Sequence, residues 1–117
     1  MKGKTADLVR LKHISNCISD LEEILKGVDA DSFYRSNEKK YAVERILQII
    51  GEAVNRISEQ TLEKASHSFR WRDVVDFRNL ITHEYFRVDY TIVYKLATEE
   101  IPKLKSVIQS LIEELSR

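Results

Sequence analysis

Arg78 and His83 stand five positions apart, and their types suit them to act together on a phosphodiester. A histidine takes a proton from a ribose 2′-hydroxyl or gives one to the leaving 5′-oxygen, because its pKa lies near neutrality. An arginine is always charged and donates hydrogen bonds to a phosphate whose charge grows in the transition state. Asn79, next to the arginine, could orient these groups or bind phosphate. The set predicts metal-independent RNA cleavage through 2′-hydroxyl attack, which leaves a cyclic phosphate and spares DNA.

The spacing of this pair does not by itself bring the two side chains together. Five residues rotate a side chain by roughly 140° around an ideal helix. Either the helix ends before His83, or groups from two chains combine. A structural alternative is also open, in which Arg78 pairs with a nearby carboxylate on a solvated face and His83 is a polar helix terminus. The nearby carboxylates are Asp73, Asp76 and Glu84. For Arg70, Arg72 and Arg87, which flank the pair, solvated ion pairing is the alternative to contact with RNA.

Apolar residues recur every three or four positions along almost the whole chain, which predicts an all-α, up-and-down bundle in a single domain over residues 1–117. The main helices are expected near 6–26, 36–58 and 71–83, with a fourth that begins at the cap Asp89 and contains Ile92. Gly27 is expected to end the first helix, a short helical piece is expected at 32–35, and 59–70 is expected to be mostly loop. Pro102 predicts a kink in the last helix.

The second predicted helix has a wide apolar face that runs from Tyr41 to Ile57. Such a face has more to bury than a four-helix bundle needs, so we expect a homodimer whose interface includes the helix of the Arg-His pair. Glu52 interrupts this face. It should pair with a basic residue or with the region of the Arg-His pair, or else point to solvent. Cys17 lies near the apolar stripe of the first helix and is expected to be buried.

The composition of the 117 residues narrows the function further. Lys and Arg number 19 and Asp and Glu number 19, so the formal net charge is zero. This balance argues against generic electrostatic binding to nucleic acid or membrane, and an anionic substrate must be recognised locally. One cysteine, three scattered histidines and the lack of a glycine-rich phosphate loop predict no disulfide, no metal site and no cofactor. With no apolar run of about 20 residues and no signal-like N-terminus, we expect a cytoplasmic protein.

The stretch from Arg78 to Tyr85 resembles a known motif. It is similar to the Arg-x4-6-His motif of the HEPN superfamily of ribonucleases, and with Tyr85 to the Arg-x4-His-x-Tyr pattern of the HepT-like toxins. Glu84 stands where family members often carry Gly, and Arg70 where many carry Pro. The resemblance extends over nearly the whole chain. Its other parts are Trp71, Ile50-Gly51-Glu52-Ala53, Val88-Asp89-Tyr90 and Ile101-Pro102-Lys103-Leu104.

The resemblance implies an all-α homodimer with a ribonuclease site composed from both protomers, in which Arg78 and His83 are catalytic. It also implies a toxin–antitoxin pair. The partner would be a minimal nucleotidyltransferase antitoxin of the MntA type, which transfers AMP to the motif tyrosine, here Tyr85. A bulky nucleotide there would block RNA by repulsion and by size. Three alternatives stay open: a helical module that binds the nucleotidyltransferase with little nuclease activity, a purely structural helical dimer, and a Tyr85 that merely packs at the core's edge.

Overall fold

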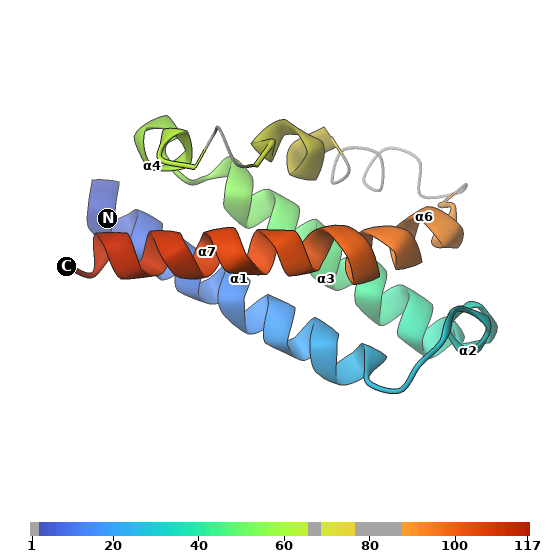
Figure 1. The fold of residues 1–117 in the computed structure, drawn as a ribbon. Coiled ribbons are helices and arrows are strands. Elements are labelled where there is room, and N and C mark those ends of the chain that lie inside the picture. Colours follow the sequence, from blue (N-terminus) through green and yellow to red (C-terminus); the bar gives the residue numbers. More distant parts are fainter. Residues whose placement is uncertain (1–2, 66–68, 77–87) are drawn as a thin grey trace.

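The computed structural model describes residues 3–65, 69–76 and 88–117. The long helix α1 (Gly3–Leu25) packs against α3 (Asn37–Asn55) and against α7 (Ile101–Leu115), and these helices form the body of the bundle in Figure 1. The all-α class predicted from the sequence is confirmed, and the described residues contain no β-strand. The third predicted main helix is described over 71–76 and is helical there; its predicted continuation to His83 lies outside the described residues.

Local capping explains where the first helices begin and end. Helix α1 stops before Gly27, whose φ of 71° lies in the left-handed region that glycine adopts without strain. The carboxylate of Asp29 accepts a hydrogen bond from Ser32 N at 2.8 Å and caps α2 (Ala30–Arg35). The hydroxyl of Ser36 accepts from Lys39 N at 3.1 Å and caps α3. Each of these boundaries was predicted within a few residues.

The end of α3 differs from the prediction. The helix stops at Asn55 and does not reach Ser58. Ser58 instead caps α4 (Glu59–Glu63), and it also binds the buried carboxylate of Asp7 on α1. These contacts of Ser58 join segments more than 50 residues apart.

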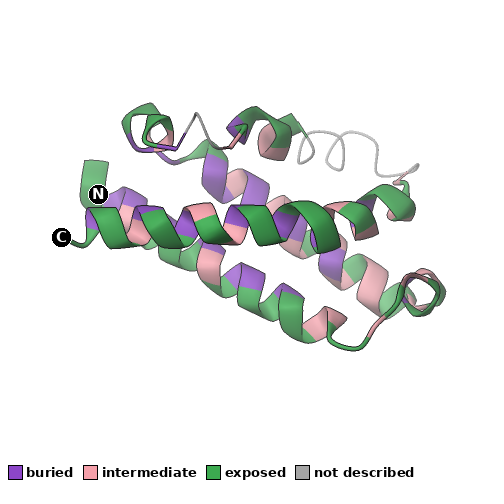
Figure 2. Cartoon of the chain, viewed as in Figure 1, coloured by how far each residue is buried: buried purple, intermediate pink, exposed green. Residues whose placement is uncertain are grey.

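The core lies between α1, α3 and α7, with contributions from α2 and α6 (Tyr90–Lys95), as the buried strips in Figure 2 show. Tyr94 closes one end, because its ring packs against Phe33 with centroids 5.2 Å apart and its hydroxyl donates to Val28 O at 3.1 Å. Cys17 is buried, as predicted. The largest fully buried side chains are Phe33, Leu11, Ile14, Ile18, Leu21, Ile50, Leu104, Ile108, Val43, Val54 and Val93.

The last helical stretch begins at the predicted cap, where Asp89 accepts from Thr91 N at 2.9 Å. Between α6 and α7 the chain makes a π-helical turn, η2 (Leu96–Glu100), in which Ile101 N–H donates to Leu96 O. Pro102 follows in the first turn of α7, where its missing N–H costs least. The helical path thus continues past the proline through a π turn, and the kink expected there stays a prediction.

Two side chains of the predicted apolar faces are exposed on the single chain. Tyr41, placed on the apolar face of the second helix, has 59% of its surface exposed. Ile92, placed on the apolar line of the last helix, is 42% exposed. Both stand near the start of their helix, where fewer neighbouring elements remain to cover a side chain.

Candidate functional site

The residues predicted to do chemistry, Arg78, Asn79, His83 and Tyr85, lie outside the described residues. Their roles therefore stay predictions. The structure describes the segments on both sides of them, 69–76 before and 88–90 after, and shows what holds these two flanks.

Trp71 anchors the upstream flank. Its side chain is buried and its indole Nε1 donates a hydrogen bond to Leu62 O of α4 at 2.9 Å. The ring of Phe69 packs edge-on against it with centroids 5.1 Å apart. The helix over 71–76 thus begins at a fixed point, because the tryptophan joins it to the bundle by both burial and a hydrogen bond.

The charged side chains of this helix pair with each other on its exposed surface. Arg70 Nε lies 3.9 Å from Asp73, and Arg72 Nε lies 3.7 Å from Asp76. For these two arginines the structure shows the solvated ion pairing that was the alternative to RNA contact; Arg87 lies outside the described residues. Asp73 and Asp76, two of the carboxylates considered as partners of Arg78, are already paired with other arginines.

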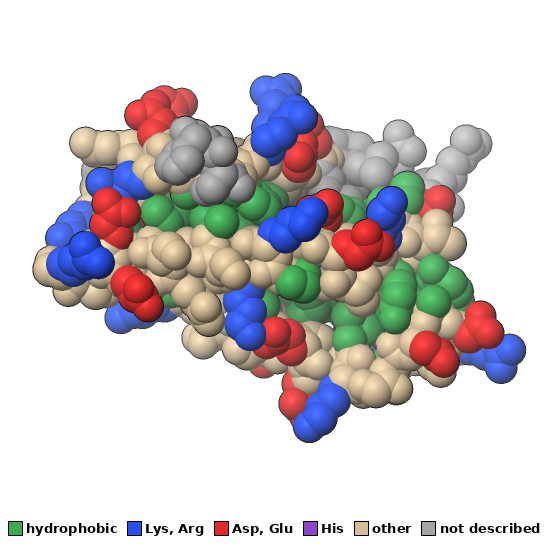
Figure 3. Space-filling model, viewed as in Figure 1, with side chains coloured by type: hydrophobic (Ala, Val, Ile, Leu, Met, Phe, Trp, Pro, Cys, Tyr) green, Lys and Arg blue, Asp and Glu red, His purple; other side chains and the backbone are tan. Residues whose placement is uncertain are grey.

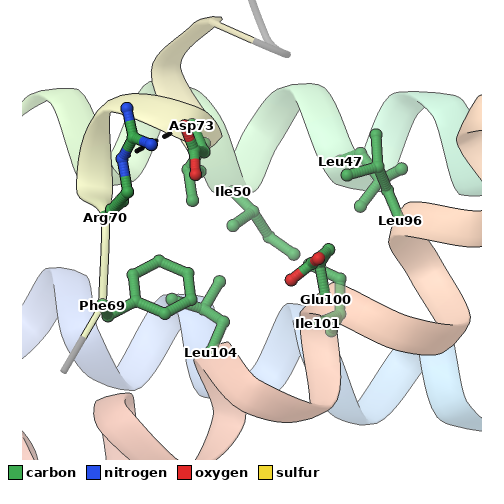
Figure 4. Close-up of a pocket in the computed structure, with 10 residues that line it drawn as sticks. Leu47, Ile50, Phe69, Arg70, Asp73, Leu96, Glu100, Ile101 and Leu104 are labelled. Carbon is green, nitrogen blue, oxygen red and sulfur yellow. Dashed lines mark ion pairs between the residues drawn. The ribbon is translucent and has the colours of Figure 1, made fainter.

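A mostly apolar cleft of about 310 Å³ lies beside this helix, as Figure 4 shows. Its walls come from three parts of the chain: α3, the segment before and within 71–76, and the π turn with the start of α7. The paired Arg70 and Asp73 stand on one side of it and Glu100 on another. The lining residues are Leu47, Ile50, Phe69, Arg70, Asp73, Val74, Leu96, Glu100, Ile101 and Leu104.

Tyr90 anchors the downstream flank to α3. Its hydroxyl donates to Glu44 Oε1 at 2.5 Å, and Lys40 Nζ lies 5.1 Å from the centre of its ring. Burial raises the pKa of Tyr90, and the hydrogen bond to Glu44 and that carboxylate's charge raise it further, so the phenol stays protonated. The ring of Tyr41 lies beside it, with centroids 6.4 Å apart. Sequence reasoning missed this group; the adjacent Lys40 and Tyr41 early in the helix were the available signal.

A shallower groove of about 220 Å³ between α1 and α3 holds Glu52, whose pairing was left open by the sequence. Arg10, His13 and Arg56 line the same groove. Glu52 is half-buried, and none of the ion pairs among the described residues includes it. Within the part of the chain that the structure describes, the half-buried carboxylate therefore lines a basic groove without a direct salt bridge.

The described part of the chain holds no group of three or more His, Cys, Asp or Glu side chains that could bind a metal ion. Among the same residues, no helix combines the length and the apolar character that crossing a membrane requires. The one described cysteine, Cys17, lies 3.8 Å from His13 Nε2, and burial, followed by the charge of Asp20, raises its pKa.

Residues 14–111 of the chain match the family described as Ribonuclease HepT-like. A protein of Methanocaldococcus jannaschii named as a candidate RNase is 34% identical over 99 residues, which cover 85% of this chain and 90% of the relative. A second such protein of that organism is 34% identical over 105 residues, covering 90% of each. A protein of Thermococcus cleftensis named as a probable ribonuclease HepT is 31% identical over 101 residues, covering 86% of this chain and 91% of the relative. No solved structure matches the chain significantly.

Proposed function

This chain belongs to the HepT-like ribonuclease family, and we propose that it is the toxin of a toxin–antitoxin pair and cleaves RNA without a metal ion. The observation that carries the proposal is the family match over residues 14–111, a range that includes Arg78, Asn79, His83 and Tyr85. The anchored helix over 71–76 supports it, because residue 76 precedes Arg78 by only two positions in the sequence.

The proposed reaction is an internal transesterification. The ribose 2′-oxygen attacks the adjacent phosphorus, the bond from phosphorus to the 5′-oxygen breaks, and a 2′,3′-cyclic phosphate remains. His83 takes the proton from the 2′-hydroxyl or gives one to the leaving 5′-oxygen. Arg78 donates hydrogen bonds to the phosphate oxygens as their charge grows, and Asn79 supports the position of these groups.

The active form in this proposal is a homodimer with a composite site. The rotation between Arg78 and His83 on a continuous helix is overcome when two copies face each other across a two-fold axis, because each copy then supplies the group that the other cannot place.

The proposed control point is Tyr85. The partner, a minimal nucleotidyltransferase, would transfer AMP to the phenol oxygen and so place a phosphate and an adenosine two residues from His83. The phosphate repels the RNA backbone, and Arg78 could hold it in place of substrate.

RNA cleavage by the purified chain tests the proposed activity. We expect cleavage in excess EDTA, products that end in a 2′,3′-cyclic phosphate, and no cleavage of DNA of the same sequence. Loss of activity in chelator would overturn the metal-independent mechanism. A chain that binds the neighbouring nucleotidyltransferase but leaves RNA intact would be a binding module instead of an enzyme.

Co-expression with that nucleotidyltransferase tests the control point. Intact-mass measurement should show increments of AMP that disappear in Tyr85→Phe, and the Phe variant should stay toxic in the presence of the partner. An unmodified chain that is nevertheless neutralised would mean inhibition by binding alone.

A further inference from the structure

Tyr41 presents an aromatic ring to solvent in the first turns of α3. Its exposed fraction of 59% is the highest of the large hydrophobic side chains in the described part of the chain. The ring packs on one side near Tyr90, with an interplanar angle of 56°. The Tyr41 ring therefore has one aromatic neighbour, and much of its surface is open to a ligand.

The neighbour is itself firmly held. Tyr90 donates to Glu44 Oε1 and lies under Lys40 Nζ, so its ring is held against α3 from two sides. Helices α3 and α6 begin at the same end of the bundle in Figure 1, and the two are in contact. Lys40, Tyr41, Arg45 and Tyr90 are called the Tyr41 platform below.

The cations of the platform differ from those of the upstream flank. Neither Lys40 nor Arg45 takes part in an ion pair among the described residues; Arg45 Nη1 donates to the neutral Gln48 at 3.2 Å. The hydroxyl of Tyr90 already occupies one oxygen of Glu44, and Glu38 is the other acidic residue on this part of α3. On the face shown in Figure 3, basic and acidic side chains alternate and form no large patch of one sign.

We infer that the Tyr41 platform binds an unpaired nucleotide of an RNA strand, with the base stacked on the Tyr41 ring and a flanking phosphate near Lys40 or Arg45. The inference rests on the proposed ribonuclease function. An open aromatic ring beside cations is the combination that single-stranded nucleic acid requires, since every base has a face that stacks and every linkage carries a charge. A protein partner would need a contiguous apolar surface, whereas the residues three and four positions from Tyr41 on its helix are polar. They are Asn37, Glu38, Glu44 and Arg45.

The platform and the catalytic pair are close enough in the sequence for one RNA strand to contact both. Tyr90 follows His83 by seven residues, and seven residues span at most about 25 Å even when fully extended. A base bound at the platform therefore lies within a few nucleotides of the cleaved bond. Because the base must be free to stack on protein, the substrate is unpaired at this position.

The test is the affinity of the full chain for a short, fluorescently labelled 2′-O-methyl RNA. This probe keeps the bases and phosphates but lacks the 2′-hydroxyl nucleophile, so binding is measured apart from cleavage. Tyr41→Ala should weaken binding at least about fivefold, the lower range for loss of one stacked base. Tyr41→Phe keeps the ring and should stay within about twofold of the unchanged chain, a difference of only about 0.4 kcal/mol. Val9→Ala, on α1 and 52% exposed, removes apolar surface of matched exposure and should have no effect.

Two further measurements separate stacking from charge. On an oligomer of abasic sugar phosphates, Tyr41→Ala and the unchanged chain should bind equally, because there is no base to stack. With the 2′-O-methyl probe, Lys40→Gln should reduce the slope of log affinity against log salt by about 0.7, the value for one phosphate contact on a single strand.

The outcomes test this inference separately from the proposed ribonuclease function. If the chain cleaves RNA and Tyr41→Ala binds the probe as well as the unchanged chain does, the platform is not an RNA contact and the ribonuclease function stands. If the chain binds the probe through Tyr41 but cleaves no RNA, the ribonuclease proposal fails and the binding surface stands. If Tyr41→Ala changes the molar mass in light scattering and leaves RNA affinity unchanged, the ring contacts a second copy and the inference is wrong.

Discussion

Charged side chains are buried in one region of the molecule and exposed in another. The first region is the corner where α1 meets α4, and the second is the helix over 71–76. At the corner, the carboxylate of Asp7 is 2% exposed and accepts hydrogen bonds from Ser58 N at 3.0 Å and from Thr61 Oγ1 at 2.7 Å, and a third from the Ser58 hydroxyl. On the helix over 71–76, Arg70 and Arg72 form exposed ion pairs with Asp73 and Asp76. A buried, fully bonded carboxylate fixes a structure, whereas exposed pairs contribute about 0–1 kcal/mol.

This difference predicts that the buried charge stabilises the fold, whereas the exposed charges are available to bind a substrate. Removing the buried charge leaves donors without partners, and the fold loses free energy. Removing an exposed charge from the helix over 71–76 leaves its partner in contact with water, so the free energy of unfolding changes little. These positions can therefore carry whatever charge a substrate requires. Variants in each region should therefore change one property and spare the other.

The largest expected effect is on catalysis. Arg78→Ala or His83→Ala should each reduce the rate of RNA cleavage at least about 100-fold, since each removes a group that acts in the transition state. Rates are measured with excess enzyme on labelled RNA, and circular dichroism confirms that each variant is folded. Cleavage that survives both substitutions together would contradict the assignment.

The corresponding change at the corner should affect stability. Asp7→Ala should lower the free energy of unfolding by about 2–3 kcal/mol, because Ser58 and Thr61 lose their charged acceptor while buried. Urea unfolding followed by circular dichroism measures the change. Asp20→Ala is the matched control, an exposed carboxylate on the same helix that should change stability by less than about 0.5 kcal/mol.

Acid should weaken the same corner. Burial alone would raise the pKa of Asp7, but the hydrogen bonds from Ser58 and Thr61 outweigh it and lower this pKa from the ordinary value of 3.8. The folded state then binds fewer protons than the unfolded state, so the stabilisation is complete above 3.8 and is lost as the pH falls through the lowered value. The difference in unfolding free energy between the unchanged chain and Asp7→Asn should shrink over that range. A constant difference would show that Asp7 does not titrate there.

The sequence predicted what depends on near neighbours. The caps at Asp29, Ser36 and Asp89 and the stop at Gly27 involve partners within a few residues, so residue type and position are sufficient to predict them. Asp7 binds Ser58 and Thr61, which follow it by 51 and 54 positions, and no local sequence pattern predicts these contacts.

The candidate site was predicted by a different route. Arg78 and His83 were found by their chemistry, but their spacing left several arrangements open, and it was the resemblance to a family that favoured one of them. Tyr41 was placed on an apolar face because a tyrosine ring counts as apolar in a periodic pattern. Its exposure depends on which elements reach the first turns of α3. The periodicity of apolar residues does not distinguish a buried ring from an exposed one.

A smaller effect is expected where the motif helix joins the bundle. Trp71→Phe keeps an aromatic ring but removes the hydrogen bond from Nε1 to Leu62 O, which should cost about 1 kcal/mol of unfolding free energy. Cleavage should fall severalfold at temperatures where the variant is fully folded, because the helix that precedes Arg78 loses a fixed contact. Equal kcat in the two proteins would show that the hydrogen bond serves stability alone.

The smallest effect should come from the exposed pair nearest to the motif. Arg72→Gln removes the ion pair with Asp76, whose atoms lie 3.7 Å apart on a solvated surface. Water and salt screen such a pair, so the free energy of unfolding should change by less than about 0.5 kcal/mol, and by less still at high salt. The same variant on labelled RNA at low and high salt reports whether the guanidinium also contacts substrate. A loss of more than about 1 kcal/mol would show that this exposed pair stabilises the fold as the buried Asp7 group does, and the contrast between the two regions would be wrong.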